Sequence, residues 1–270
     1  MSRRPRSLAL CCGLLGGLLL LDLVLPVVNL LWQADWPGWT AALRRAGARD
    51  ALWVSVVSST IAMLVMTLLG VPLGWLLARS RVPLKQLWIA LVFLPMVVPD
   101  LAGGILLLQT FGPRGLVGQP LAGPGIELTN NLAGIVLSQI FVASPFVIVS
   151  ALAGFAGVDP RLEAAAATLG DSAWRSFWRI SLPLAWPGIA AGITLAWIRA
   201  MGEFGGTLIM AYNPHSLPVY MWVMFESDGL AGALPAAFCL VALAAAAVAA
   251  STLLNRLAGA ARLVTSPGGA

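Results

Sequence analysis

Six stretches of the chain are almost continuously apolar, and the polar residues gather between them. A helix needs about 20 apolar residues to cross the hydrocarbon core of a membrane. Each stretch therefore predicts a membrane-spanning helix, and we place these helices at residues 8–31, 51–78, 87–109, 131–152, 186–211 and 231–255. The second, fourth and sixth contain no charged residue.

The apolar stretches are rich in Leu, Ala and Val and lack the alternation typical of strands in a lipid-facing barrel. Hydrophobic residues make up 59% of the chain and charged residues 10%, against about 25% charged in soluble domains. Lipid-exposed backbone must satisfy its own hydrogen bonds, which helices do. The sequence predicts an all-α membrane protein with about six transmembrane helices.

Lys and Arg placement predicts the orientation, because short cytoplasmic loops are enriched in these residues. We interpret residues 8–31 as an uncleaved first span, because the apolar run is too long for a signal peptide. With the N-terminus inside, the outer set is Arg44, Arg45, Arg49 and Arg114, and the cytoplasmic set is Arg3, Arg4, Arg6, Arg79, Arg81, Lys85, Arg161, Arg175, Arg179, Arg256 and Arg262. We expect both termini in the cytoplasm, and the high pI, near 9.9, then reflects topology.

Between the fourth and fifth spans lies a polar segment with clear helix signals. Asp159 can cap a helix that begins at Pro160, and Gly170 can end it in a left-handed conformation. Asp171 or Ser172 can cap a second short helix that ends before Pro183. The first helix has a face of small alanines, which favours docking of a soluble partner. The alternative is an amphipathic helix lying on the membrane, favoured by Trp174, Phe177 and Trp178.

This segment resembles the EAA loop of ABC importer permeases, a pattern of Glu-Ala-Ala, three residues, Gly, nine residues and Ile-x-Leu-Pro. Nine residues separate Gly170 from Ile180-Ser181-Leu182-Pro183, and the Glu-Ala-Ala positions fall on Ala164, Ala165 and Ala166. The motif glutamate is therefore absent, and whether Glu163 substitutes for it stays open. The resemblance implies an ATPase-coupling loop with the contact residues Glu163, Ala164, Ala165, Ala166, Gly170, Asp171, Ile180, Leu182 and Pro183.

The segment RAMGEFGGTLIMAYNP, residues 199–214, is similar to a signature of molybdate and tungstate permeases. Related sulfate and thiosulfate permeases usually have Tyr where this chain has Phe204. The resemblance implies a type I (MetI-like) importer permease in the cytoplasmic membrane of a prokaryote. It divides the chain into residues 1–50, with the first helix and an outer loop, a permease core at 51–255 with the coupling loop at about 153–185, and a short cytoplasmic tail at 256–270.

The same resemblance implies the partners: a second copy of the permease, two cytoplasmic ABC ATPase subunits and an extracytoplasmic oxyanion-binding protein. The chain lacks the G-x-x-x-x-G-K-[ST] loop that binds nucleotide phosphates. We therefore expect no catalytic residue and no cofactor on this chain, with ATP and Mg on the partner ATPase. The single histidine, His215, and three scattered cysteines predict no metal site.

Charges inside the predicted spans are the candidate pathway residues. Arg199 and Glu203 lie four residues apart on one helical face, and a charge in the bilayer costs at least about 2.5–3.5 kcal/mol unless it is paired or hydrated. The pair either shapes a transport pathway, with Thr194 and Thr207 nearby, or forms an internal salt bridge. Asp22 and Asp100 are further charges in apolar stretches, and neither predicts a tight site for a dianion.

Two other functions remain open from the sequence. A sulfate or thiosulfate ABC permease would look similar, because selectivity is expected to reside in the binding protein. A stand-alone secondary anion transporter would also have six spans and buried charges. A membrane-embedded enzyme is disfavoured, because the chain has no cluster of His, Asp or Glu in a catalytic arrangement.

Overall fold

The computed structural model describes residues 6–80 and 83–265, with side chains described between residues 10 and 253 except at residues 11, 81 and 82. Arg3, Arg4 and Arg81 of the predicted cytoplasmic set, and residues 266–270 of the predicted tail, lie outside the described residues. All regular structure in the described part is helical. The helices are α1 (Arg6–Trp32), α2 (Trp36–Leu43), α3 (Ala46–Arg79), α4 (Lys85–Val97), α5 (Asp100–Phe111), α6 (Gly118–Ala122), α7 (Leu132–Ala156), α8 (Pro160–Thr168), α9 (Ala173–Ser176), η1 (Phe177–Ser181), α10 (Leu182–Met201), α11 (Gly205–Met210) and α12 (Leu217–Thr265).

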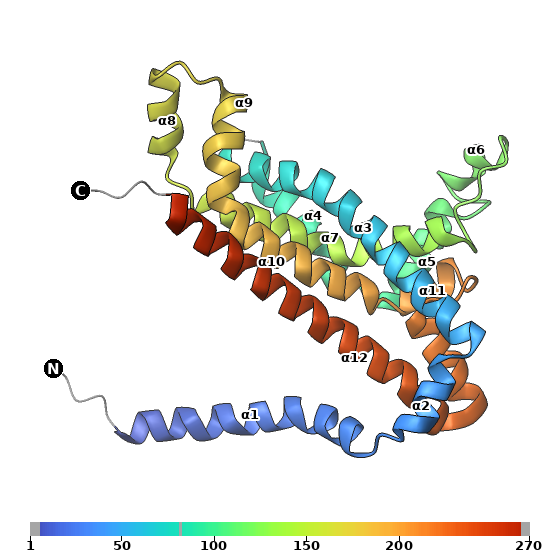
Figure 1. Ribbon diagram of the computed structural model, residues 1–270. Helices are drawn as coiled ribbons and strands as arrows, with labels where there is room; N and C mark the ends of the chain where they lie inside the picture. The colour runs from blue at the N-terminus through green and yellow to red at the C-terminus, as the bar shows by residue number, and fades with distance from the viewer. Residues whose placement is uncertain (1–5, 81–82, 266–270) are drawn as a thin grey trace.

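The expected number of spans is confirmed. Within the described residues, five helical segments are long and apolar enough to cross a membrane, and there are six if the bent pair of α4 and α5 counts as one span. The bundle is elongated, with α8 and α9 at one end and α2, α6 and α11 at the other (Figure 1). Arg79 and Arg161 thus lie at the opposite end from Arg45 and Arg114, as the predicted topology requires. Which end faces the cytoplasm stays a prediction.

Helices α3, α7 and α10 form the core, and small residues let their backbones approach closely. Ala62, Ala143, Ala151 and Ala196 are fully buried in one cluster. A Cβ atom built on Gly74 would lie 2.6 Å from the Cβ of Ala151, so glycine is required where α3 crosses α7. Small residues permit such close packing of helices, whereas a Cβ atom built on Gly13 in α1 would meet nothing within 4 Å.

Replacing Gly74 by Ala is expected to lower the thermal unfolding midpoint in detergent. Overpacking a core costs typically about 1–3 kcal/mol, and here the added methyl group meets Ala151 and the backbone of α7. Gly13→Ala is the matched control, because it brings the same gain in helix propensity without a packing clash. Equal midpoints for the two variants would contradict the close approach of α3 and α7.

The third predicted span is broken by proline. α4 and α5 meet at an angle of 112°, and the break falls at Val98 and Pro99, where Val98 has an extended conformation. A residue before proline is disfavoured in helical geometry, and proline cannot donate the next hydrogen bond. The interruption therefore follows from Pro99, whereas Pro95 lies inside α4.

The predicted helix at 186–211 starts earlier than predicted and is interrupted at residues 202–204. α10 ends at Met201, residues 202–204 are not helical, and α11 follows as a separate short helix. The Glu203 side chain accepts a hydrogen bond from the backbone N–H of Gly206 at 2.6 Å, which satisfies a free donor at the start of α11. Hydropathy alone does not detect such a break, because the flanking residues remain apolar.

The predicted sixth span lies within a longer helix. α12 starts at Leu217, not at residue 231, and bends at Gly229, which has a φ of 69°. Its first part packs on α3 through Leu217 and Tyr220, and its second part forms the span. The outer segment that follows the first span forms α2, where Trp39 is buried against Phe238 of α12.

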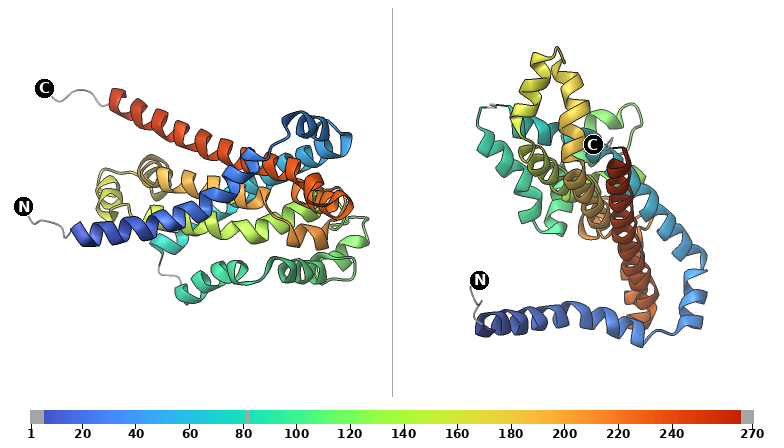
Figure 2. Two further views of the ribbon diagram at one scale, coloured as in Figure 1. Left: turned by 90° about the horizontal axis from the view of Figure 1, so that it is seen from below. Right: turned by 60° about the vertical axis from the view of Figure 1, so that its left-hand side comes forward.

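α1 stands apart from the bundle. None of its apolar window between Cys12 and Trp32 is buried against the rest of the described chain, and Figure 2 shows it separated from the other helices along most of its length. Leu14, Leu18 and Leu21 are each more than half exposed. Such a surface is stable only when lipid or another protein covers it.

Candidate functional site

The helix α8 begins and ends on the predicted signals. Asp159 accepts a hydrogen bond from the backbone N–H of Arg161 at 2.9 Å, and Pro160 is the first helical residue. At the other end Gly170 has a φ of 89°, and the N–H groups of Gly170 and Asp171 donate to the carbonyls of Ala167 and Ala166. This pair of bonds is a Schellman motif. Both predicted signals are confirmed.

The second helix of the segment differs from the prediction. Ser172 caps α9 by accepting a bond from the N–H of Arg175 at 3.3 Å, but the helix does not end before Pro183. It continues through the π-helical turn η1 into α10, so that residues 173–201 form one segment. Pro183 is tolerated because it lies in the first turn of α10, and the wide turn before it relieves the crowding that proline causes.

The surface of α8 combines small and apolar side chains. Of its nine residues, all of which are described, only Ala166 is buried, and Ala164 and Ala165 are exposed. The flanking leucines also face outward: Leu162 is 46% exposed and Leu169 is 88% exposed. The alanines, Leu162 and Leu169 together give this end of the chain an exposed surface of small and apolar side chains.

The remaining predicted loop residues lie around the foot of α10. Ile180 and Pro183 line a groove of about 420 Å³ together with Leu162 and Arg179, and Leu182 packs against the core. Asp171 forms an ion pair with Arg175 at 3.1 Å. Gly170 and Asp171 thus form the tip of the segment, and the Ile-x-Leu-Pro positions form its base.

The aromatic residues lie on α9 and η1 and not on α8. Trp174 and Trp178 are 71% and 51% exposed, and both rings contact Phe177. Trp174, Phe177 and Trp178 line, with Trp75 of α3, an apolar groove of 610 Å³. The interfacial interpretation therefore suits α9 and η1, whereas α8 presents the small-residue face.

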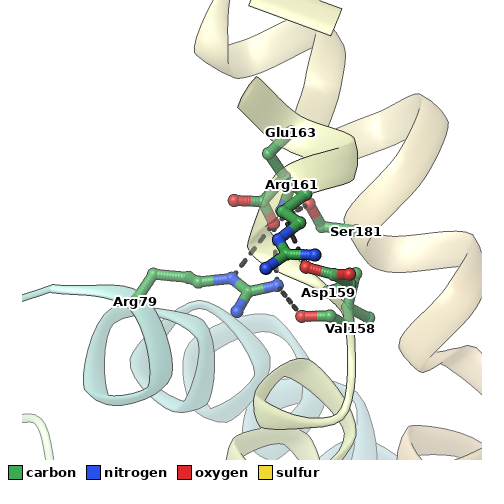
Figure 3. Close-up of polar contacts among 6 residues, drawn as sticks. All are labelled: Arg79, Val158, Asp159, Arg161, Glu163 and Ser181. Atoms are coloured by element: carbon green, nitrogen blue, oxygen red, sulfur yellow. Dashed lines mark hydrogen bonds and ion pairs between the residues drawn. The ribbon is translucent and has the colours of Figure 1, made fainter. Parts of the chain in front are cut away.

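A polar network joins α8 to the bundle (Figure 3). The carboxylate Oε1 of Glu163 accepts hydrogen bonds from Arg79 Nε at 3.0 Å and from Ser181 Oγ at 2.6 Å. Arg79 also donates through Nη2 to the carbonyl of Val158 at 2.7 Å. The sequence placed Arg79 only among the cytoplasmic cations. Its partner Glu163 lies 84 positions away in the sequence, so no local pattern predicted the pair.

A second ion cluster lies where the two broken spans meet. Arg199, near the end of α10, contacts Glu203 Oε2 through Nη1 at 3.1 Å and Asp100 Oδ1 through Nη2 at 2.7 Å. The Glu203 side chain is fully buried, whereas the side chains of Arg199 and Asp100 are 29% and 45% exposed. The expected pairing of Arg199 with Glu203 is present, and Asp100 is an additional partner that sequence reasoning missed.

Close packing of the half-helices α5 and α11 holds this cluster together. A Cβ on Gly104 of α5 would lie 2.9 Å from the Cα of Gly206, and one on Gly205 would lie 2.8 Å from the Cβ of Asp100. The start of α5, which carries Asp100, is therefore seated directly on the start of α11. The two breaks are therefore in direct contact.

The two threonines of the predicted pathway are in different places. Thr207 is fully buried in α11, and its hydroxyl has no hydrogen-bond partner among the described residues. Thr194 lies further along α10, where its hydroxyl donates to the carbonyl of Ala190 and lies 2.9 Å from Ser251 Oγ of α12. The structure thus brings Arg199, Glu203 and Thr207 together at the break and leaves Thr194 on the side that faces α12.

The chain is similar to known transport proteins over most of its length. Residues 70–261 match the family described as binding-protein-dependent transport system inner membrane component. A probable molybdenum ABC transporter permease of Haloferax volcanii is 44% identical over 87% of this chain and 86% of its own length. The molybdenum transport system permease ModB of Mycobacterium tuberculosis is 37% identical over 76% and 79%, and the molybdate/tungstate permease WtpB of Thermococcus kodakarensis is 40% identical over 72% and 73%.

Solved structures share the fold at low sequence identity. A chain of a bacterial ABC transporter that imports alginate superposes with a TM-score of 0.70 at 17% identity, over 97% of both chains. A chain of the MetNI methionine ABC transporter, in an inward-facing form, gives 0.64 at 16% identity over 77% of this chain and 94% of its own. These likenesses concern the fold alone.

Proposed function

Because the chain belongs to the family of binding-protein-dependent inner-membrane transport components, we propose that it is the membrane-spanning subunit of an ATP-driven importer of molybdate or tungstate. It is a multi-pass inner-membrane protein with the fold of type I ABC importer permeases, and a transport component, not an enzyme. Membership implies that a partner ATPase hydrolyses ATP and that a binding protein delivers the substrate. The identity of the transported oxyanion is the part that we propose. It is supported by relatives of 37–44% identity that are named for molybdenum or for molybdate and tungstate.

The observation that carries the proposal is the exposed surface of α8. A nine-residue helix is too short to be stable in isolation, and this one projects from the end of the bundle with Leu162 and Leu169 exposed. Docking of an ATPase would bury these side chains. Ala164, Ala165, Gly170 and Asp171 are the proposed contacts at this surface, with Ile180, Leu182 and Pro183 supporting its base.

A homodimer is part of the proposal and has support of its own. α1 contains Asp22 and is unburied along its apolar window, and the ion pair of Asp100 and Arg199 is partly exposed at the break between α4 and α5. Charges inside a bilayer must face protein or water. A second copy of the permease would supply the protein surface, and a hydrated path between the two copies would supply the water. Each copy docks one ATPase subunit.

The proposed pathway passes the break between α10 and α11. Here Arg199, Glu203 and Thr207 sit beside the break of α4 and α5, and Thr194 lies further along α10. Arg199 already contacts two carboxylates, so it does not offer a free positive charge to an oxyanion. We assign the cluster a gating role. The anion then passes the gate while it is transiently hydrated, and it does not bind at a tight site there.

Uptake measurements test the function. In proteoliposomes that contain the chain, its ATPase and its binding protein, radiolabelled molybdate or tungstate is expected to accumulate only when ATP and binding protein are both present. Accumulation without ATP would instead support a stand-alone secondary transporter. Preference for sulfate over both metal oxyanions would support the sulfate alternative, and calorimetry on the binding protein would name the anion.

A further inference from the structure

Arg79 and Glu163 join three separate parts of the chain at the base of α8. Arg79 is the last residue of α3, Glu163 lies in the first turn of α8, and Ser181 is the last residue of η1, directly before α10. We propose that this network is a rigid connection that makes α8 move together with α3 and α10. Arg79 and Glu163 are then positioning residues, and the inference rests on the proposed function of α8 as the ATPase docking helix.

The Glu163 carboxylate is directed toward the bundle. Three donor atoms, Arg79 Nε, Arg79 Nη2 and Ser181 Oγ, lie within 3.0 Å of its Oε1 atom. The side chain is 25% exposed and that of Arg79 is 12% exposed. This oxygen is therefore occupied by donors of the same chain, and Glu163 is better suited to orient α8 than to replace the missing motif glutamate at a partner surface.

The connection between α7 and α8 is fixed by the same guanidinium. Only residues 157–159 join the two helices, and a link this short acts as a pivot unless it is held. Arg79 Nη2 donates to the carbonyl of Val158 at 2.7 Å, and the Val158 side chain is buried. One arginine therefore holds both the link and the first turn of the helix that follows it.

Few other contacts hold α8 in place. Its buried residue is Ala166, and the helix packs on α9 and η1, which continue into α10. The network adds the connection to α3. Without it, a push on the exposed face of α8 would tilt the helix at its link and at Gly170, and would reach α3 only indirectly, through α9, η1 and α10.

The test separates docking from transmission. In proteoliposomes with ATPase and binding protein, Glu163→Gln and Arg79→Gln are expected to retain bound ATPase within about two-fold of wild type. The number of anions imported per ATP hydrolysed is expected to fall at least five-fold. Lys85→Gln is the matched control, because Lys85 is a cation at the same end and makes no ion pair among the described residues; it should behave as wild type.

Two results would overturn the inference. Loss of ATPase from Glu163→Gln would make Glu163 a docking contact, and unchanged import per ATP in both variants would make the network dispensable. If Arg79→Gln does not fold, Arg79→Lys replaces it, because lysine keeps the charge but lacks the planar guanidinium fork that contacts the Glu163 carboxylate and the Val158 carbonyl together; it should give an intermediate ratio. Failure of the proposed function would be distinct, because the wild-type chain itself would then not bind ATPase or import the oxyanion.

Discussion

Replacing Leu169 by Glu is expected to abolish ATP-driven uptake and to release the ATPase from the permease. Leu169 follows α8 directly and is 88% exposed, so the substitution removes no contact within the chain. Burial of a leucine contributes about 1.5–3 kcal/mol, which corresponds to roughly 10- to 150-fold in affinity. A glutamate in the docked surface adds the cost of an unpaired buried charge. The measurement is ATPase retained on affinity-purified permease, together with uptake.

Leu116→Glu is the matched control for this prediction. Leu116 is 85% exposed and lies between α5 and α6, at the opposite end of the bundle. The control variant should retain ATPase at the wild-type level. If Leu169→Glu does the same, α8 is not the docking surface, whereas equal loss in both variants would indicate that an exposed charge harms folding wherever it is placed.

The segment from Asp159 to Gly170 could be predicted well because its signals are local. A capping aspartate, a proline at the first position and a glycine at the end act within a few residues of where they stand, and the bonds of Asp159 and the conformation of Gly170 follow from them. The membrane spans formed by α3 and α7 could be predicted equally well from the sequence. Their apolar runs are long and free of charge, so their extent depends little on tertiary contacts.

The breaks and ion pairs were harder to predict because they depend on contacts between distant residues. Glu203 lies between α10 and the short helix α11, although the apolar residues around it predicted one continuous span. Asp100 was recognised as unusual, but its partner Arg199 is 99 positions away. Glu226 and Asp228 interrupt the apolar run before residue 231, which hid the true start of α12.

Arg199→Gln is expected to be the most damaging single change in the ion cluster. Glu203 is fully buried, and Arg199 is its only charged partner among the described residues. Removing one member of a buried pair costs about 3–5 kcal/mol, because the remaining charge is left uncompensated. Folded protein, measured by size-exclusion chromatography in detergent, should fall sharply. Asp100→Asn should be milder, since Asp100 is 45% exposed and Arg199 keeps Glu203.

The double variant Arg199→Gln/Glu203→Gln separates a gate from a structural salt bridge. It removes the buried charge of Glu203 together with its partner Arg199, and glutamine at position 203 can still accept the N–H of Gly206, so most of the folded protein should return. Uptake should nevertheless stay at least ten-fold below wild type while ATP hydrolysis continues, because the gate no longer responds to the movement of α5. Glu203→Gln alone should show the same uncoupling. If the folded double variant shows wild-type uptake and coupling, the pair of Arg199 and Glu203 only holds α11 in place. The pathway role would then be withdrawn.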